Sequence, residues 1–131
     1  MKTIALIITC IMFSHTIHAQ DETILKIGPQ GGGMKTVQNY NIELVNSISR
    51  IYVYLYDKSL TPVSNDGVLS EIMFCYDYDE CLNKSLTILG KNGYTTNLAN
   101  SHFNYCEVTL IINGKPIKAK FNNTSGLTEN K

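Results

Sequence analysis

Apolar and polar residues alternate along most of the chain that follows residue 20. In "NYNIELV", Tyr40, Ile42 and Leu44 share one face, while Asn41 and Glu43 take the other. Successive side chains of a β-strand point to opposite sides, so this period of two predicts strands with one buried face. Stretches with the 3.6-residue period of an amphipathic helix are missing from the same part of the sequence. The pattern therefore predicts an all-β protein.

A second strand is expected at "RIYVYLYD", residues 50–57, where both faces are apolar. Its two faces are Ile51, Val53, Leu55 and, opposite them, Tyr52, Tyr54, Tyr56. A strand of this kind is typical of the middle of a sheet. The three tyrosines are also a candidate interaction surface, because exposed aromatic side chains often anchor protein partners. The structural interpretation is favoured, since tyrosine suits strands and its phenol reaches water from a half-buried face.

Further strands are separated by clear turn signals. The stretch "KSLTPVSNDG" is expected to be a loop, residues 68–76 and 81–89 to be strands, and Asn92-Gly93 to turn the chain into a short strand at 94–98. The segment "CEVTLIINGKPIKAKF" is expected to form a hairpin with its turn at Asn113-Gly114. About seven short strands with regular turns predict a single antiparallel β-sandwich of immunoglobulin-like type, and a small barrel is the alternative.

The first residues have the pattern of a secretory signal peptide. Lys2 precedes an apolar run from Ile4 to Phe13, and Ala19 gives a small residue before Gln20 for cleavage. The run is shorter than the roughly 20 residues that a membrane-spanning helix needs. We therefore expect a periplasmic or secreted protein whose mature chain does not insert into the membrane. Lipidation at Cys10 is disfavoured, because Thr9 stands where a small residue is usual.

The expected organisation is a signal peptide at 1–19, a glycine-rich lead-in at 20–35, the β-sandwich domain at 36–121 and a polar tail at 122–131. Cleavage leaves a chain long enough for one modest core. Lys2 is the only charged residue that is lost, so the formal charge falls from 0 to −1. This balance gives no electrostatic reason to expect a nucleic-acid partner.

The glycine run "GPQGGG" raises the question of a phosphate-binding loop. Such a loop needs glycines between a strand and a helix, followed by a lysine and a hydroxyl residue. Here the glycines precede a strand, so nucleotide binding is disfavoured. The simpler expectation is that Gly31, Gly32 and Gly33 let the chain turn with positive φ as it enters the sandwich.

The segments "GPQGG", "NYNIELV" and "YVYLYDKSLTPVSNDGV" resemble a group of small exported bacterial domains. These domains carry a Pro-His-Gly-Gly opening, an Asn-Tyr-x-Ile-Glu strand and a Tyr-Leu-x-Asp strand. They are similar to a domain near the N-terminus of periplasmic adaptor subunits of heavy-metal cation efflux pumps. The resemblance implies a periplasmic β-sandwich associated with copper or other heavy-metal handling.

This chain departs from the family pattern inside the opening motif, Pro29, Gln30, Gly31 and Gly32. Gln30 stands where the family has histidine, and an amide is a poor ligand for soft or borderline metals. The departure weakens the inference of metal binding and leaves the inferred fold unchanged. Gln30 thus raises the question of whether a metal site has been lost.

Three cysteines remain after the signal peptide: Cys75, Cys81 and Cys106. Cys75 and Cys81 flank the acidic segment "YDYDE" and are a candidate disulfide across a hairpin, which leaves Cys106 unpaired. The sharper alternative gathers the three thiols with His102, and Met73 in reserve, into a site for Cu(I) or Zn(II). These spacings match no established metal signature, so the disulfide or buried-thiol interpretation is favoured.

The remaining candidate groups give little support to other functions. His102 is the only histidine after residue 19, which excludes most triad chemistry, and it is expected to be a solvated loop residue. The acids Asp77, Asp79 and Glu80 lack the glycine and the terminal glutamate of a calcium loop, so a solvated hairpin tip is favoured.

The sequence therefore predicts an exported, non-enzymatic module. The leading hypothesis is an accessory in copper- or zinc-type heavy-metal homeostasis, which binds a metal or contacts an efflux component. The alternative is an envelope structural or interaction protein that uses the tyrosine face or a free sheet edge and binds no metal.

Overall fold

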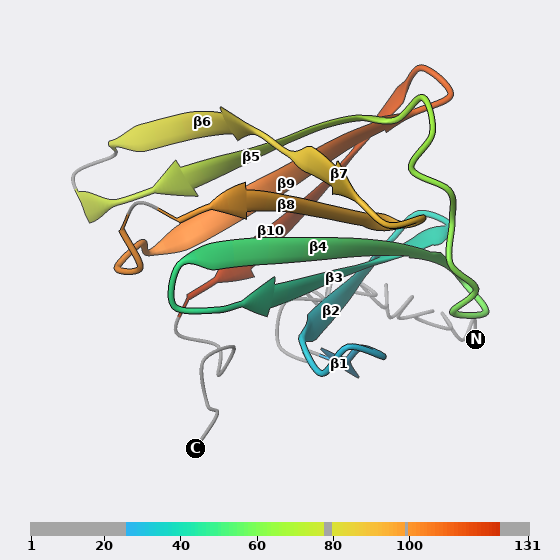
Figure 1. Cartoon of the computed structure of the whole chain (residues 1–131), viewed down its shortest axis with the longest axis horizontal. Coiled ribbons are helices and arrows are strands. Elements are labelled where there is room, and N and C mark those ends of the chain that lie inside the picture. Colours follow the sequence, from blue (N-terminus) through green and yellow to red (C-terminus); the bar gives the residue numbers. More distant parts are fainter. Residues whose placement is uncertain (1–25, 78–79, 99, 124–131) are drawn as a thin grey trace, which may run out of the picture.

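The computed structural model describes residues 26–77, 80–98 and 100–123. These residues form two antiparallel sheets that pack face to face as a β-sandwich (Figure 1). The first sheet, sheet A, has the strand order β1-β2-β3-β4-β8-β7, and the second, sheet B, has the order β10-β9-β5-β6. The strands are β1 (Lys26–Ile27), β2 (Gly33–Val37), β3 (Tyr40–Asn46), β4 (Arg50–Asp57), β5 (Leu69–Cys75), β6 (Cys81–Ser85), β7 (Thr87–Leu89), β8 (Gly93–Asn97), β9 (Tyr105–Ile112) and β10 (Lys115–Asn122).

The architecture confirms the antiparallel β-sandwich expected from the alternating pattern. The strand expected at 50–57 is β4, and it lies in the middle of sheet A between β3 and β8. The expected signal peptide at 1–19 and the tail from 124 onward lie outside the described residues, as do Tyr78 and Asp79 of the acidic tip. No helix in the described residues is long and apolar enough to cross a membrane.

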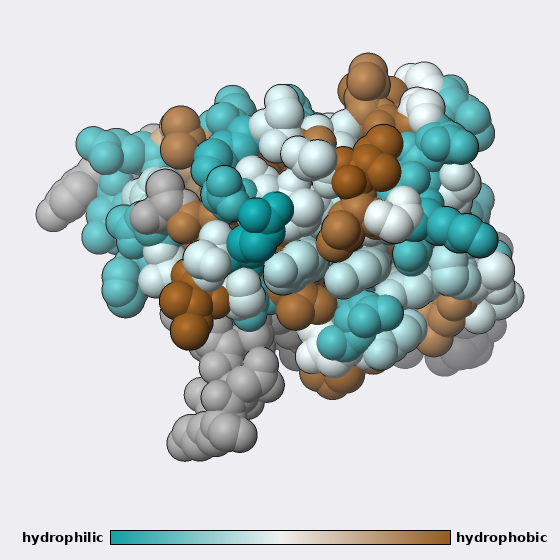
Figure 2. Space-filling model, viewed as in Figure 1, coloured by the Kyte–Doolittle hydropathy of each residue, from teal (hydrophilic) through white to brown (hydrophobic). Residues whose placement is uncertain are grey.

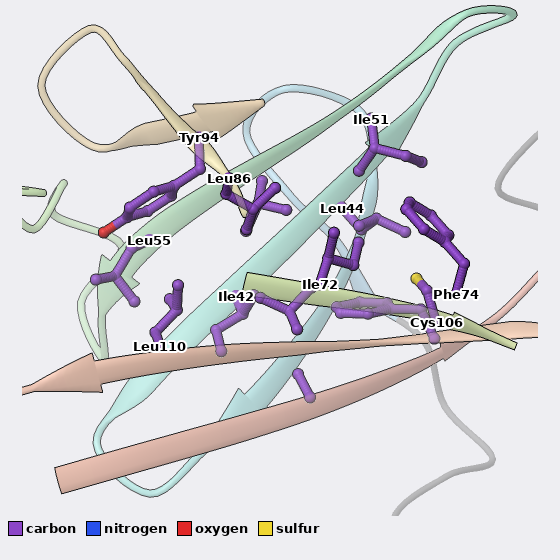
Figure 3. Packing of buried hydrophobic residues seen from close by; sticks show 14 of the residues in the cluster. Ile42, Leu44, Ile51, Leu55, Ile72, Phe74, Leu86, Tyr94, Cys106 and Leu110 are labelled. Atoms are coloured by element: carbon purple, nitrogen blue, oxygen red, sulfur yellow. The ribbon is translucent and has the colours of Figure 1, made fainter. Parts of the chain in front are cut away.

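The core lies between the two sheets. In sheet A, Ile42 pairs with Leu55 and Leu44 with Val53, so alternate residues of β3 and β4 face inward together. They meet the inward residues of sheet B, which include Phe74 (Figure 3). Apolar side chains from both sheets thus form one continuous cluster, as expected for a sandwich core. Its members are Ile42, Leu44, Ile51, Val53, Leu55, Ile72, Phe74, Leu86, Tyr94, Leu98, Phe103, Cys106, Val108, Leu110, Ile112, Ile117, Ala119 and Phe121.

The hairpin expected at the end of the sequence is present. β9 and β10 pair over their full length, and Asn113 and Gly114 form the turn with φ of 52° and 77°. Two consecutive residues with positive φ are characteristic of the two-residue hairpin turn that matches strand twist, which explains the Asn-Gly pair.

The segment 81–89 differs from the single strand that the sequence predicts. The chain pairs with β5 in sheet B as β6, then leaves that sheet at Leu86 and pairs with β8 in sheet A as β7. Leu86 is buried in the core, whereas every residue of β7 is exposed. The anchoring of Leu86 between the layers therefore splits one apparent strand into two.

One strand and the start of a second lie within the segment that was expected to be a lead-in. β1 and the first half of β2 fall before residue 36, and β2 pairs with β3 from Gly33 onward. The glycines conceal this strand from sequence reasoning, because Gly is unfavourable in strand interiors.

Candidate functional site

Glu43 lies on the outer face of sheet A, yet its side chain is 0% exposed. The alternating pattern of β3 assigned this position to a polar, solvent-facing side, so its burial corrects that expectation. The segment from β1 to β2 folds over the outer face and covers the carboxylate. A buried carboxylate is costly unless hydrogen bonds replace its hydration, so its partners determine its role.

Three groups donate hydrogen bonds to this carboxylate. The backbone N–H of Gln30 donates to Oε2 at 2.9 Å and to Oε1 at 3.2 Å. The backbone N–H of Gly32 donates to Oε2 at 2.8 Å, and the Tyr56 hydroxyl donates to Oε1 at 2.9 Å. Among the described residues no cation lies within ion-pair distance of Glu43. The negative charge is thus held by backbone amides and one phenol.

The glycine run owes its composition to this arrangement. A Cβ added to Gly28 would collide with the carboxyl group of Glu43, and one added to Gly32 would collide with the backbone oxygen of Leu44. Gly31 has a φ of 83°, a conformation that other residues rarely adopt. Positive φ was expected at all three glycines from 31 to 33, but only Gly31 has it. The run is therefore a backbone cradle for a carboxylate that the protein itself supplies.

The cradle also changes the tyrosines beside it. Burial raises the pKa of Tyr56 first, and the hydrogen bond to Glu43 and the charge of its carboxylate raise it further. Burial raises the pKa of Tyr54 as well, with smaller contributions from Glu43 and Tyr52. Both phenols therefore keep their protons to a higher pH than an exposed tyrosine does, and Tyr56 remains a donor to Glu43.

This geometry favours a structural role for Glu43 over a chemical one. Both oxygens are hydrogen-bonded, and the side chain has no exposed surface on which a substrate or ion could bind. The group therefore fixes the segment 28–32 on the sheet. The side chain of Gln30 is exposed beside Tyr56.

Tyr52, Tyr54 and Tyr56 share the outer face of sheet A, as the sequence predicts. Tyr52 and Tyr54 are half-buried and Tyr56 is buried. The ring of Tyr54 covers Gly93 of the neighbouring strand, where an added Cβ would lie 3.3 Å from a ring carbon. These contacts give Tyr54 and Tyr56 structural roles.

The structure confirms the disulfide between Cys75 and Cys81. The two residues face each other in register on β5 and β6, with a Cα–Cα distance of 4.1 Å. Cys106 is free and buried in the core, where burial raises the pKa of its thiol to about 12. A thiol in this state is inert, so Cys106 packs as a small apolar residue.

These positions do not assemble the sulfur site considered from the sequence. Cys75 and Cys81 are bonded to each other, and Cys106 lies between the sheets. His102 is exposed and lines an open depression with Asp77 and Glu80 at the β5–β6 tip. In the described part of the chain, no three His, Cys, Asp or Glu residues are grouped as a metal site.

Replacement of both bridging cysteines by alanine is expected to lower the free energy of unfolding by about 2 kcal/mol, because the bridge closes only a short loop. Urea unfolding under oxidising and reducing conditions measures this. Alkylation of the native wild-type protein should label no thiol, whereas alkylation after unfolding should label Cys106 alone. Labelling of two further thiols without reductant would contradict the bridge.

Sequence reasoning missed Glu43 as the central residue of the cradle. The local pattern held little signal, because Glu43 occupies a polar position of an alternating strand, as Asn41 does, and its one clue is that this strand follows the glycine run. The connection between them is made only when β1 and β2 fold back on β3.

Comparison of the chain with models of protein families, with characterised proteins and with solved structures finds no match in any of the three.

Proposed function

We propose that this protein is an exported, non-enzymatic β-sandwich module that acts by binding another protein of the cell envelope. The observation that carries the proposal is the edge of sheet A at β7, beside which no further strand lies in the described part of the chain. Ile88 and Leu89 are 52% and 41% exposed there, and β7 contains no charged residue. Figure 2 shows apolar side chains gathered where β7 crosses the front of the molecule. An uncharged, apolar sheet edge is a template for pairing with another strand.

The absence of catalysis belongs to the proposal and is supported by the state of the reactive groups. Glu43 is saturated by its hydrogen bonds, Cys106 is buried, and His102 is exposed. A general base or nucleophile needs an accessible side chain held within reach of a partner group. None of these three residues combines the two properties.

The link to heavy metals rests on the resemblance to adaptor domains of efflux pumps. The described residues offer no grouped ligands, so we propose a role in copper or zinc homeostasis through contact with an efflux component rather than through a resident metal. The expected location in the periplasm, which follows from the signal pattern, is part of the same proposal.

Photo-crosslinking in cells that produce the protein tests this function. A photoreactive amino acid replaces Ile88 in one variant and Tyr52 in a second. A third variant carries it at Ile48, which is 95% exposed on the β3–β4 turn and serves as the control. We expect a discrete adduct from position 88 that is missing from position 48, identified by mass spectrometry.

The identity of the adduct decides between the versions of the proposal. An efflux component supports the heavy-metal role, and another envelope protein supports an interaction function without metal. An adduct from position 52 alone would move the binding surface to the tyrosine face. If positions 52 and 88 give no adduct beyond that of position 48, the proposed function is wrong.

A further inference from the structure

The four strands at the sheet edges differ in charge. β10 carries three exposed lysines, Lys115, Lys118 and Lys120. β6 carries Lys84, whose ammonium donates a hydrogen bond to the backbone oxygen of Asn97 at 2.7 Å. Lysines on edge strands oppose pairing with other chains, so the lysines of β10 and β6 disfavour strand addition at both edges of sheet B. Sheet A lacks such protection at β7, and its other edge, β1, has only Lys26.

The two edge strands of sheet A, β1 and β7, are connected by one continuous row of paired residues across the sheet. Successive strand pairings connect residues of the six strands into one rung, which runs through Ile27, Gly33, Leu44, Val53, Tyr94 and Ile88. Ile27 at one end is 71% exposed, and Ile88 at the other is 52% exposed. Both side chains lie on the same face of sheet A as Leu44, Val53 and Tyr94 of the rung, which point into the core. Because β1 and β7 are the outermost strands of the sheet, the two isoleucines nevertheless remain exposed. One rung thus ends in an exposed isoleucine at each edge.

The backbone of Ile88 is directed toward the free edge. In an antiparallel ladder, hydrogen-bonded and non-hydrogen-bonded pairs alternate, and a residue directs its N–H and C=O to the same neighbour. Leu55 N donates to Asn92 O at 3.0 Å, two positions from the Val53–Tyr94 pair, so that pair is bonded as well. Tyr94 therefore directs its backbone groups to β4. Ile88, on its other side, directs its own away from the sheet.

The backbone of Ile27 has the matching orientation. Gly28 N donates to Gly32 O at 2.8 Å, one position from the Ile27–Gly33 pair. The pair at Ile27 is therefore non-hydrogen-bonded, and the N–H and C=O of Ile27 point to the side of β1 on which no described strand pairs. Sheet A has six strands, each antiparallel to its neighbours, so β1 and β7 run in opposite directions.

We infer that sheet A continues from one copy of the chain to the next, with β1 of one copy pairing antiparallel to β7 of another and Ile27 opposite Ile88. A second copy placed beside the first in the same orientation satisfies three requirements together. The strand directions alternate correctly, the outward N–H and C=O groups face each other, and the exposed isoleucines lie on the same side. Lys26 then stands opposite Leu89, so no two like charges meet.

The contact is heterologous, because β1 of one copy meets β7 of the next. Such contacts produce open chains of molecules unless the rotation closes a ring. β1 and β7 are short, so we expect concentration-dependent association rather than a permanent dimer. The inference rests on the proposed function, since it names a second copy as the partner of the β7 edge.

Sedimentation of the exported protein over a range of concentrations tests the association. We expect the average mass to rise with concentration and to return to the monomer value in Ile88→Lys and in Ile27→Lys. Both side chains are exposed, so neither change should unfold the chain, and circular dichroism verifies this. Ile48→Lys, at a still more exposed isoleucine on neither edge, should associate like the wild type. A wild-type protein that stays monomeric at every concentration overturns the inference.

Engineered cysteines identify the geometry. Residues of a hydrogen-bonded antiparallel pair have Cα atoms about 5.5 Å apart, which a disulfide can bridge. A mixture of Ile27→Cys and Ile88→Cys should form a mixed disulfide dimer on oxidation, whereas each variant alone should form none. A dimer from Ile88→Cys alone would indicate a two-fold β7–β7 contact and would overturn the proposed pairing.

Photo-crosslinking at position 88 separates failure of this inference from failure of the proposed function. An adduct with twice the mass of the chain supports self-pairing. An adduct with a different protein, together with no mixed disulfide, overturns self-pairing and leaves the interaction function in place. The absence of any adduct from position 88 overturns self-pairing, and its absence from both positions 52 and 88 overturns the proposed function as well.

Discussion

Glu43→Ala is expected to destabilise the protein by about 3 to 5 kcal/mol. The substitution removes the acceptor that serves the N–H groups of Gln30 and Gly32 and the hydroxyl of Tyr56, for which the described residues offer no other, and these donors are partly or fully buried. Buried donors without partners cost about 1 to 3 kcal/mol each, and water entering the cavity recovers part of this. Urea unfolding measures the free energy of unfolding, and hydrogen exchange should show faster exchange at the amides of residues 30 and 32.

Glu43→Gln separates the effect of the charge from that of the hydrogen bonds, and Glu71→Ala is the control. Glu43→Gln keeps one acceptor but turns an amide NH₂ toward the cradle, so a loss of about 1 to 3 kcal/mol is expected. Glu71→Ala removes an exposed glutamate on β5 and should change stability by less than about 0.5 kcal/mol. If Glu43→Ala is no more destabilising than Glu71→Ala, the cradle does not hold the segment 28–32.

The second large effect is expected at alkaline pH. Burial raises the pKa of Tyr94 and of the Cys106 thiol to about 12, from 10.0 and 9.0, and raises the pKa of Tyr54 and Tyr56. A raised pKa means that the unfolded chain loses its proton first. The stabilisation is therefore complete below about pH 9 and is lost as the pH rises toward 12 and beyond. Urea unfolding between pH 8 and 12 should show a steep fall in the free energy of unfolding.

Tyr94→Phe provides the test of this assignment. The Tyr94 hydroxyl is buried and has no hydrogen-bond partner among the described residues, and Figure 3 shows it at one end of the core cluster. Its removal is therefore expected to leave stability at pH 7 unchanged or about 1 kcal/mol higher. The same variant should lose less stability than the wild type between pH 10 and 12. An unchanged alkaline profile in Tyr94→Phe would show that other groups dominate.

The cradle explains how the opening motif contributes to the fold without a ligand. A short loop with backbone amides aimed at one point is commonly an anion site. In this chain a carboxylate from β3 fills it, and the hydroxyl of Tyr56 on β4 completes the set. The motif therefore joins β1 and β2 to the middle of sheet A, which in turn fixes the free edge at β1.

Most of the strands could be predicted because the alternation and the turn residues that define them lie within a few neighbouring positions. The alternation in β3 and β4 and the Asn113-Gly114 turn are readable from neighbouring residues alone. The Cys75–Cys81 bridge was likewise foreseeable, because a hairpin between them brings the two residues together. The division of residues 81–89 into β6 and β7 at Leu86 could not be foreseen. It depends on where sheets A and B lie, because β6 joins sheet B and β7 joins sheet A.

By itself, the sequence determined the all-β class, the central position of β4, the final hairpin and the candidate disulfide, because periodicity and turn residues act over a few positions. Tertiary structure alone decided that Glu43 is buried under the glycine run and that the proposed metal ligands are not grouped. It alone also placed Ile27 and Ile88 at opposite ends of one rung. Each of these depends on pairing between segments that are distant in the chain, and the local pattern of residues does not encode such pairing.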